Sequence, residues 1–451
     1  MAPDRTTLER AGLSQESVDV DVRGLAAGGA GIADLPDGRV VFVPRTTEGD
    51  RARVRIERSR PRWARGSLVS LLTASPDRVE PACSLFAECG GCQLQHLAYE
   101  DQLRWKGRFV VDALTRIGGF SDVPVPEVVP SPGRLRYRNR VSYTLRRVGN
   151  GYVVAGFHAL DRPAHVVDVA DECLLPDERL TSAWMSLRQS WGRRAELLPT
   201  AGRLRLTLRL GHSNDGAFEL IVEGGRHGWD GEPLLATVDA LSAIWHVSGG
   251  RDRRDEVGDD DHSDREATLV AGEGELAAGS SFTQVNDAAS HSLRSHVLER
   301  CRAIDAGSAV DAYCGLGAYG LGLASDGWTV AGIESERGAI QRLTRSLELA
   351  GDGRFSLHSG RVEDVLPSLL PVDLLILNPP RKGLHESVPE HVIAAPPAHI
   401  VYVSCDPATL ARDLKRLSER YTLEGLRAFD LFPQTAHIET VAELSLRSRA
   451  E

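Results

Sequence analysis

The segment from Ala309 to Glu334 constrains the fold more than any other part of the chain. A buried apolar strand enters the glycine turn Cys314-Gly315-Leu316-Gly317, and a second apolar strand, Thr329 to Ile333, ends at Glu334. In a doubly wound sheet, an acid about 20 residues after such a turn hydrogen-bonds ribose hydroxyls, while the glycines allow close backbone approach. The pattern predicts a Rossmann-like domain with a nucleoside cofactor at Gly315, Gly317 and Glu334.

Two later strands end at polar or reactive side chains. Residues 372–377 run into Asn378-Pro379-Pro380, and residues 400–403 run into Ser404 and Cys405. Ligands of open α/β sheets bind outside the carboxyl ends of the strands, so a thiol placed there can act as a nucleophile. An isolated cysteine is, however, more often a small buried hydrophobe. We predict an α/β domain over residues 271–451.

The last predicted strand, Thr440 to Leu444, follows a polar segment that contains His437 and Glu439. In an extended chain, residues two apart point to the same face. These two side chains therefore either share one face as a functional pair or belong to a surface loop that leads into the strand.

Residues 17–73 have an all-β pattern. Residues 18–22 and 52–56 alternate apolar and polar side chains, and Pro36-Asp37-Gly38 is a hairpin signal. Short strands with glycine-rich turns predict a small barrel of the oligonucleotide-binding kind over residues 16–74, with a generic β-module as the alternative. Residues 1–15 are predicted to be a disordered tail.

Arginines gather in two places although the net charge of the chain is −10. One group lies between Arg45 and Arg65, and the other lies between Arg134 and Arg147 together with Tyr137 and Tyr143. Polyanions respond to local potential rather than net charge. Each cluster alone fits a solvated strand face equally well, but two clusters in one chain favour RNA or DNA as a partner.

Cys83, Cys89 and Cys92 form a C-x5-C-x2-C run, and Cys173 is the nearest candidate for a fourth ligand. Four thiolates suit a tetrahedral zinc ion or a [4Fe–4S] cluster, and the spacing does not separate the two. Three reduced structural thiols are the alternative. The odd total of seven cysteines does not suggest disulfides.

Residues 75–270 are predicted to form a central α+β domain that contains the four cysteines. A helix over residues 99–117 stops at Gly118-Gly119, and we expect it to pack on the C-terminal domain. Residues 251–266 form a charged segment, predicted to be a flexible loop. The N-terminus has no apolar signal core and no apolar run reaches membrane length, so we expect a cytoplasmic protein with no membrane partner. No obligate protein partner is evident.

Four C-terminal segments together resemble a known family. They are residues 311–317, 378–383, 403–413 and 433–439, with the sequences DAYCGLG, NPPRKG, VSCDPATLARD and PQTAHIE. This set resembles the RNA 5-methyluridine methyltransferases. Residues 281–286 resemble the segment by which that family enters its methyltransferase domain, and residues 17–73 resemble its TRAM RNA-binding module. The cysteine set resembles the branch that methylates 23S ribosomal RNA and carries a [4Fe–4S] cluster.

The resemblance implies a set of roles. Cys405 is the expected nucleophile toward uracil C6, Glu439 the base and His437 a neighbour that tunes it. S-adenosylmethionine is the expected methyl donor, at a site that includes Gln284, Tyr313, Glu334 and Asn378. Cys83, Cys89, Cys92 and Cys173 are the expected cluster ligands. The leading hypothesis is therefore uracil-5 methylation of RNA, with ribosomal RNA favoured over transfer RNA.

Two positions depart from the family pattern. Asn378 stands where the family has Asp, and Ala318 stands where many members have a polar residue. Asn-Pro-Pro is also similar to the amino-methyltransferase motif, although Arg381 replaces its usual aromatic residue. Methylation of an exocyclic amine and a non-catalytic iron–sulfur RNA-binding protein therefore stay open as alternatives. A Cys405/His437 hydrolase does not explain the glycine turn or Glu334.

Overall fold

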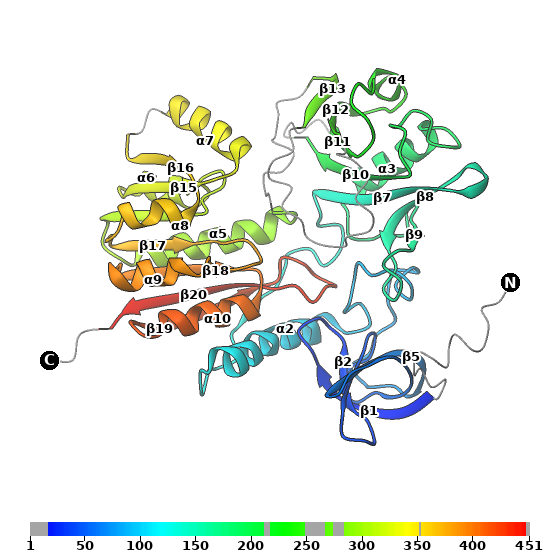
Figure 1. Ribbon diagram of the computed structural model, residues 1–451, viewed down its shortest axis with the longest axis horizontal. Helices are drawn as coiled ribbons and strands as arrows, with labels where there is room; N and C mark the ends of the chain where they lie inside the picture. Colours follow the sequence, from blue (N-terminus) through cyan, green and yellow to red (C-terminus); the bar gives the residue numbers. More distant parts are fainter. Residues whose placement is uncertain (1–16, 212–216, 249–266, 274–283, 351–352, 448–451) are drawn as a thin grey trace. The chain divides into compact units, whose positions relative to one another are not determined.

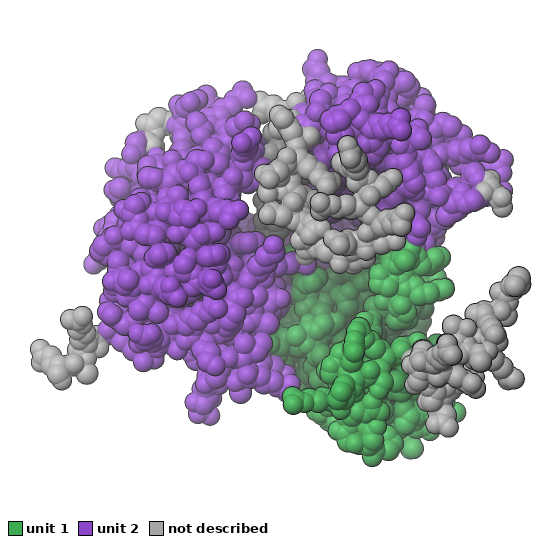
Figure 2. Space-filling view, in the orientation of Figure 1, with its two compact units in different colours: residues 1–109, 158–165, 432–437 green, residues 110–157, 166–431, 438–451 purple. Residues whose placement is uncertain are grey.

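The computed structural model describes residues 17–211, 217–248, 267–273, 284–350 and 353–447 (Figure 1). Contacts divide the chain into two compact units (Figure 2). Unit 1 comprises residues 1–109, 158–165 and 432–437, and unit 2 comprises residues 110–157, 166–431 and 438–451. The predicted tail 1–15, the predicted loop 251–266 and residues 281–283 lie outside the described residues. Among the described helices, none has the length and apolar character needed to cross a membrane.

Unit 1 is built on a closed five-stranded barrel in the order β1-β2-β3-β5-β4. Alternation along β1 and β4 places Val20, Val22 and Val54 in its core. The predicted barrel is therefore confirmed. Its strands are β1 (Ser17–Leu25), β2 (Gly31–Asp34), β3 (Val40–Val43), β4 (Arg51–Ser59) and β5 (Trp63–Thr73).

The predicted helix 99–117 consists of two parts. It runs as α2 (Tyr99–Ala113) and closes with a π-turn (Leu114–Gly118), after which Gly119 takes a φ of 75°. Trp105 and Phe109 pack in a core of unit 1 with Leu94. The end of the helix, from Val110, instead belongs to the large core of unit 2.

A mixed seven-stranded sheet forms the central part of the chain, in the order β13-β12-β11-β10-β7-β8-β9. Helices α3 (Glu178–Ser190) and α4 (Glu232–Leu235) accompany it, and a short 3-10 turn (Gly149–Gly151) joins β7 to β8. Its strands are β7 (Arg140–Val148), β8 (Tyr152–His158), β9 (Val166–Asp168), β10 (Arg203–Leu210), β11 (Phe218–Glu223), β12 (Leu241–Val247) and β13 (Thr268–Gly272).

The C-terminal part is an eight-stranded sheet in the order β16-β15-β14-β17-β18-β20-β19-β6. The strands from β16 to β18 are parallel, and β20 and β19 add an antiparallel edge. The strands are β6 (Val128–Val129), β14 (Ser308–Ala312), β15 (Thr329–Glu334), β16 (Phe355–Ser359), β17 (Leu374–Leu377), β18 (His399–Ser404), β19 (Tyr421–Phe429) and β20 (Glu439–Leu446).

Helices precede, connect and follow the parallel strands of this sheet, as the alternating pattern predicted (Figure 1). They are α5 (Asp287–Arg302), α6 (Gly320–Ser325), α7 (Arg337–Ala350), α8 (Val362–Val365) with a 3-10 turn (Leu366–Ser368), α9 (Ser387–Ala394) and α10 (Pro407–Leu417). The strand order reverses between β14 and β17, and ligands of such sheets bind at that switch point. The Rossmann-like prediction is confirmed.

Candidate active site

Cys405 lies in the tight connection between β18 and α10. The Ser404 hydroxyl donates to the carbonyl of Asp406 at 3.0 Å, and the Asp406 carboxylate caps α10 by accepting from the amides of Ala408 and Thr409 at 2.9 Å. Pro407 occupies the first helical turn, where its missing N–H costs nothing. Hydrogen bonds on both sides therefore fix the half-buried Cys405.

The loop that follows β17 is tied to α10 by two charged residues. The buried Asp413 carboxylate accepts from the amide of Leu384 and from the hydroxyl of Tyr402, both at 2.9 Å, and Arg412 donates to the carbonyl of Lys382 at 2.9 Å. Gly383 has a φ of 74°, and a Cβ there would lie 2.5 Å from the side chains of both Arg412 and Asp413. Any other residue here would strain the backbone and displace these two side chains.

Glu439 begins β20 and is 2% exposed. Burial raises its pKa to about 8, opposed by the charge of Arg381 and by a hydrogen bond from Gln284. Burial also raises the pKa of Cys405 to about 12, with the charge of Glu439 adding to the rise and Arg381 again opposing it. The structure therefore brings Cys405, Glu439 and Arg381 into one site, close enough for their charges to interact.

Arg381 was not among the residues that the sequence singled out for this site. The one sequence feature that pointed to Arg381 was its position after Asn378-Pro379-Pro380, where it replaces the aromatic residue usual in the amino-methyltransferase motif. A positive charge beside an acid and a thiol stabilises the ionised form of each. Arg381 is thus the electrostatic partner that the two predicted residues lacked.

Gln284 is held immediately before α5. Its carbonyl accepts from the side chain of Asn139 at 3.1 Å, and Asn286 caps α5 by accepting from the amide of Ala289 at 3.2 Å. While Gln284 donates to Glu439, its own Oε1 is buried without a partner among the described residues. A buried acceptor of this kind is satisfied when a ligand presents an N–H or O–H group.

The glycine turn after β14 has the strained backbone that close ligand approach requires. Tyr313 takes a φ of 64°, which is uncommon for a non-glycine residue, and a Cβ on Gly315 would meet open space. Asp311 anchors the far side of the turn by accepting from the amide of Gly320 at 2.8 Å. Burial raises the pKa of Asp311 to about 7.

Glu334 lies at the end of the neighbouring strand β15, as predicted. Its carboxylate accepts from the amides of Gly315 at 2.8 Å and of Ser335 and Glu336 at 2.7 Å. Because an ionised carboxylate has about four acceptor sites, capacity for a ligand hydroxyl is left. Asn378 follows β17 and is half-buried, and its backbone N–H donates to the carbonyl of Ala312 at 3.3 Å.

His437 is exposed, whereas Glu439 is buried. Strand pairing begins only at Glu439, so His437 stays in the preceding loop and is exposed. Its ring packs against Phe432 with centroids 5.8 Å apart. In the same loop, Gln434 exchanges hydrogen bonds with Gln102 of α2 at 3.0 Å. Glu439 therefore belongs to strand β20, and His437 belongs to the surface loop that leads into it.

The cysteine run lies in unit 1, and Cys173 lies in unit 2. Within the described ranges, no group of three or more His, Cys, Asp or Glu side chains is gathered as a metal site. Cys83, Cys89 and Cys92 nevertheless all interact with the charge of Arg45, whose Nε and Nη1 are buried without a partner among the described residues. A cationic group with unused donors fits the negative charge of a thiolate-bound cluster.

Two arginines of the second cluster make structural hydrogen bonds. Arg136 donates to the carbonyl of Cys173 at 3.2 Å, and Arg147 donates to several backbone carbonyls, including that of Ala195 at 2.8 Å. Tyr143 is buried and stacks on Trp184 with centroids 3.8 Å apart. The expectation that Tyr143 contributes to a nucleic-acid surface is therefore wrong, because its inward position on β7 commits it to the core.

Comparisons with known proteins agree with this fold. A family model described as tRNA (Uracil-5-)-methyltransferase matches residues 357–447, and the TRAM domain model matches residues 15–69. Uncharacterised RNA methyltransferases of Gloeobacter violaceus and of a Nostoc species are each 33% identical to this chain. The first alignment covers 96% of this chain and 97% of the relative, and the second covers 96% of each.

Among solved structures, the tRNA (uracil-54, C5)-methyltransferase of Pyrococcus abyssi, in complex with S-adenosyl-L-homocysteine, is similar with a TM-score of 0.70. It is 27% identical, over 95% of this chain and 100% of that chain. Fold and similarity define an S-adenosylmethionine-dependent RNA methyltransferase with a TRAM domain. The chain belongs to the RNA uracil-5 methyltransferase family.

Proposed function

We propose that this RNA (uracil-5-)-methyltransferase works through a covalent bond between the sulfur of Cys405 and C6 of the target uracil. The observation that carries the proposal is the shared site of Cys405, Glu439 and Arg381 beside the strained glycine turn. A nucleophile, a base and a nucleoside turn at neighbouring strand ends match what this reaction needs.

Uracil C5 is too weak a nucleophile to take a methyl group unaided. Attack of the Cys405 thiolate forms the S–C6 bond and moves the C5–C6 π electrons into an enolate, which makes C5 nucleophilic. C5 of this enolate can then accept the methyl group that bound S-adenosylmethionine would supply, with S-adenosylhomocysteine as the leaving group. Glu439 then takes the proton from C5, the C5–C6 double bond re-forms and the S–C6 bond breaks, which returns the thiolate.

The neighbours of these two residues assist in distinct ways. Arg381 favours the thiolate of Cys405 and the carboxylate of Glu439, since its positive charge opposes both pKa rises. Gln284 orients Glu439 by donating to it, and its unpaired Oε1 is available to a ligand N–H. Because His437 is exposed, we assign the tuning of the base to Arg381 and Gln284 instead.

The glycine turn is the proposed S-adenosylmethionine site. Tyr313, Gly315 and Gly317 shape the backbone that faces the cofactor, and Glu334 hydrogen-bonds its ribose hydroxyls with its remaining acceptor capacity. Asn378 and Gln284 contribute amide groups. The asparagine at position 378 supplies hydrogen bonds without the charge of the family's aspartate.

A [4Fe–4S] cluster held by Cys83, Cys89, Cys92 and Cys173 is the proposed metal group. The orphaned donors of Arg45 support it, and such a cluster would brace the segment that follows the barrel. Protein purified without oxygen should be brown and contain about four iron atoms per chain, and Cys92→Ser should lose them. A colourless protein with stoichiometric zinc would overturn this assignment.

The proposed substrate is ribosomal RNA in the cytoplasm, supported by the resemblance of the cysteine set to the 23S-modifying branch. Transfer RNA is the second candidate, because the Pyrococcus abyssi relative is named for it. We retain the predicted division at residues 16–74, 75–270 and 271–451 as a proposal.

The test uses ribosomal and transfer RNA from a strain that lacks this enzyme, each incubated with the protein and methyl-labelled S-adenosylmethionine. After digestion to nucleosides, label should appear as 5-methyluridine, and only in the ribosomal fraction. Label in transfer RNA instead would identify transfer RNA, the second candidate, as the substrate. Label on an exocyclic amine would contradict the proposed chemistry.

A further inference from the structure

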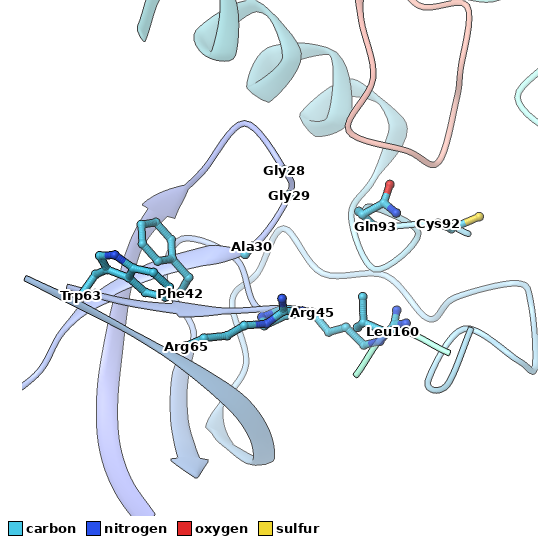
Figure 3. Close-up of a pocket in the computed structure, with 11 residues that line it drawn as sticks. Gly28, Gly29, Ala30, Phe42, Arg45, Trp63, Arg65, Cys92, Gln93 and Leu160 are labelled. Atoms are coloured by element: carbon cyan, nitrogen blue, oxygen red, sulfur yellow. The ribbon is translucent and has the colours of Figure 1, made fainter. Parts of the chain in front are cut away.

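A pocket of about 370 Å³ lies in unit 1, between the barrel and the segment that follows the cysteine run (Figure 3). The methyl-transfer site does not use it. Its lining residues come from the barrel strands, from the β1–β2 turn and from two other segments: Gly28, Gly29, Ala30, Phe42, Pro44, Arg45, Trp63, Arg65, Cys92, Gln93 and Leu160.

Two aromatic rings form one end of this pocket. Phe42 of β3 and Trp63 of β5 meet edge to face with centroids 6.3 Å apart, and Trp63 is 37% exposed (Figure 3). Alternation along β5 turns Ala64 into the barrel core and leaves Trp63 and Arg65 outside. An exposed indole on a barrel of this kind is a platform on which a nucleobase can stack.

The charge around these rings is positive and uncompensated. Four arginines of β4, β5 and the turn between them make no ion pair with a described residue, namely Arg58, Arg60, Arg62 and Arg65. Elsewhere on the barrel, Arg39, Arg53 and Arg55 each pair with a carboxylate. The guanidinium of Arg58 lies 6.0 Å from the Trp63 ring centroid, and Arg65 lines the pocket itself.

The opposite end of the pocket is fixed by close backbone packing. Gly29 has a φ of 78°, and a Cβ there would lie 2.8 Å from the Cβ of Gln93. Gln93 in turn donates to the carbonyl of Gly90 at 2.8 Å. The β1–β2 turn thus packs closely on the segment after Cys92 and closes this end of the pocket.

We propose that this pocket binds one unpaired nucleotide of the RNA substrate. The base stacks on Trp63 against the edge of Phe42, and the phosphates on either side pair with Arg65 and its unpaired neighbours. A paired base hides its faces in the helix, so the site selects single-stranded or looped RNA. The inference rests on RNA as the substrate and adds a second contact, on the barrel, to the base that enters the methyl-transfer site.

Fluorescence anisotropy on the full-length protein tests the proposal, with a single-stranded RNA probe of roughly 12 nucleotides and a duplex of the same sequence. Trp63→Ala should weaken single-strand binding by about tenfold or more, and Trp63→Phe should restore most of it. The control Tyr152→Ala removes an exposed tyrosine that does not line the pocket and should change nothing.

A second pair of variants covers the case in which Trp63→Ala disturbs the barrel. Arg65→Gln should lower the slope of log affinity against log salt by about one, whereas Arg53→Gln, whose arginine is paired with Asp19, should lower it less. Unchanged RNA binding in both Trp63→Ala and Arg65→Gln would contradict the proposal that this pocket binds a nucleotide. Binding is read without methylation, so a protein that binds RNA through the pocket but forms no 5-methyluridine would overturn only the proposed function.

Discussion

The acid Glu439 and the thiol Cys405 are electrostatically coupled. After burial, the negative charge of Glu439 is the strongest influence that raises the pKa of Cys405 to about 12. Glu439 itself has a pKa of about 8. At neutral pH both groups therefore hold their protons in the free enzyme, and the proposed mechanism requires each to be ionised at a different step. In the proposed mechanism, the charge of Arg381 favours the ionised form of each group.

Activity should rise with pH because the base must lose its proton. We expect kcat/KM to increase through about pH 8, the pKa of Glu439. Glu439→Gln should lose this inflection and should accumulate a methylated protein–RNA adduct, since nothing then removes the C5 proton. The measurement is a pH–rate profile together with denaturing gels. Normal turnover by Glu439→Gln would contradict the assignment of the base.

The same carboxyl group should make folding stability fall with rising pH. In the unfolded chain, Glu439 loses its proton as the pH rises above 4.5, its ordinary pKa. In the folded protein, Glu439 holds this proton until about pH 8. The unfolded state therefore binds fewer protons in this range, and the free energy of unfolding decreases as pH rises. Glu439→Gln should remove this loss, which amounts to up to about 3 kcal/mol at pH 7.

Urea unfolding at pH 5 and pH 7.5 measures the effect. The control Glu419→Gln alters an exposed acid and should keep the wild-type pH dependence. If Glu439→Gln and the wild type lose stability in parallel between the two pH values, the buried acid is not the cause.

Replacing Arg381 should slow the reaction most at neutral pH. Arg381→Gln removes the charge that opposes both pKa rises, so less thiolate and less carboxylate form. A loss of about tenfold or more in kcat/KM is expected near pH 7, with partial recovery at higher pH. Arg381→Lys should retain part of the rate. The neighbouring exposed Lys382→Gln is the control, and an equal loss there would indicate a general effect on RNA binding.

Gly383→Ala should destabilise the protein through a clash as well as through backbone strain. Its Cβ would lie 2.5 Å from the side chains of Arg412 and Asp413. Gly119→Ala imposes nearly the same φ, 75° against 74°, with nothing within 4 Å of the new atom. Gly119→Ala, the control, should lower the free energy of unfolding by about 1 kcal/mol, and Gly383→Ala should lower it by roughly 3 kcal/mol. Equal costs would mean that the loop after β17 is not anchored as described.

Local pattern predicted the strands of the C-terminal sheet closely. Residues 329–333 and 400–403 form β15 and β18 with small extensions, because a continuous apolar run bounded by turn residues specifies a buried parallel strand. In a parallel sheet the carboxyl ends of the strands lie at the same edge, so the residues that follow these strands were expected at that edge. This is why Cys405 and Glu334 were predicted correctly at strand ends.

Partnerships between distant residues could not be read from the sequence. Arg381 acts on Glu439 across the fold, and no local period reports that contact. Tyr143 sits among arginines in the sequence, yet β7 turns it inward onto Trp184. The pairing of β20 with β19 begins at Glu439, so His437 lies in the loop before the strand. The register of that pairing is set by tertiary structure and not by the local sequence.

The most direct test of the proposed covalent mechanism uses substrate RNA that contains 5-fluorouridine, because fluorine at C5 blocks the proton removal that we propose for Glu439. Wild-type protein with S-adenosylmethionine should form an adduct that survives denaturation and maps to Cys405. Cys405→Ala should form none, while the control Cys301→Ala, which removes a buried cysteine of α5, should form it normally. An adduct in Cys405→Ala, or no adduct from wild-type protein that methylates the unfluorinated RNA, would contradict the account.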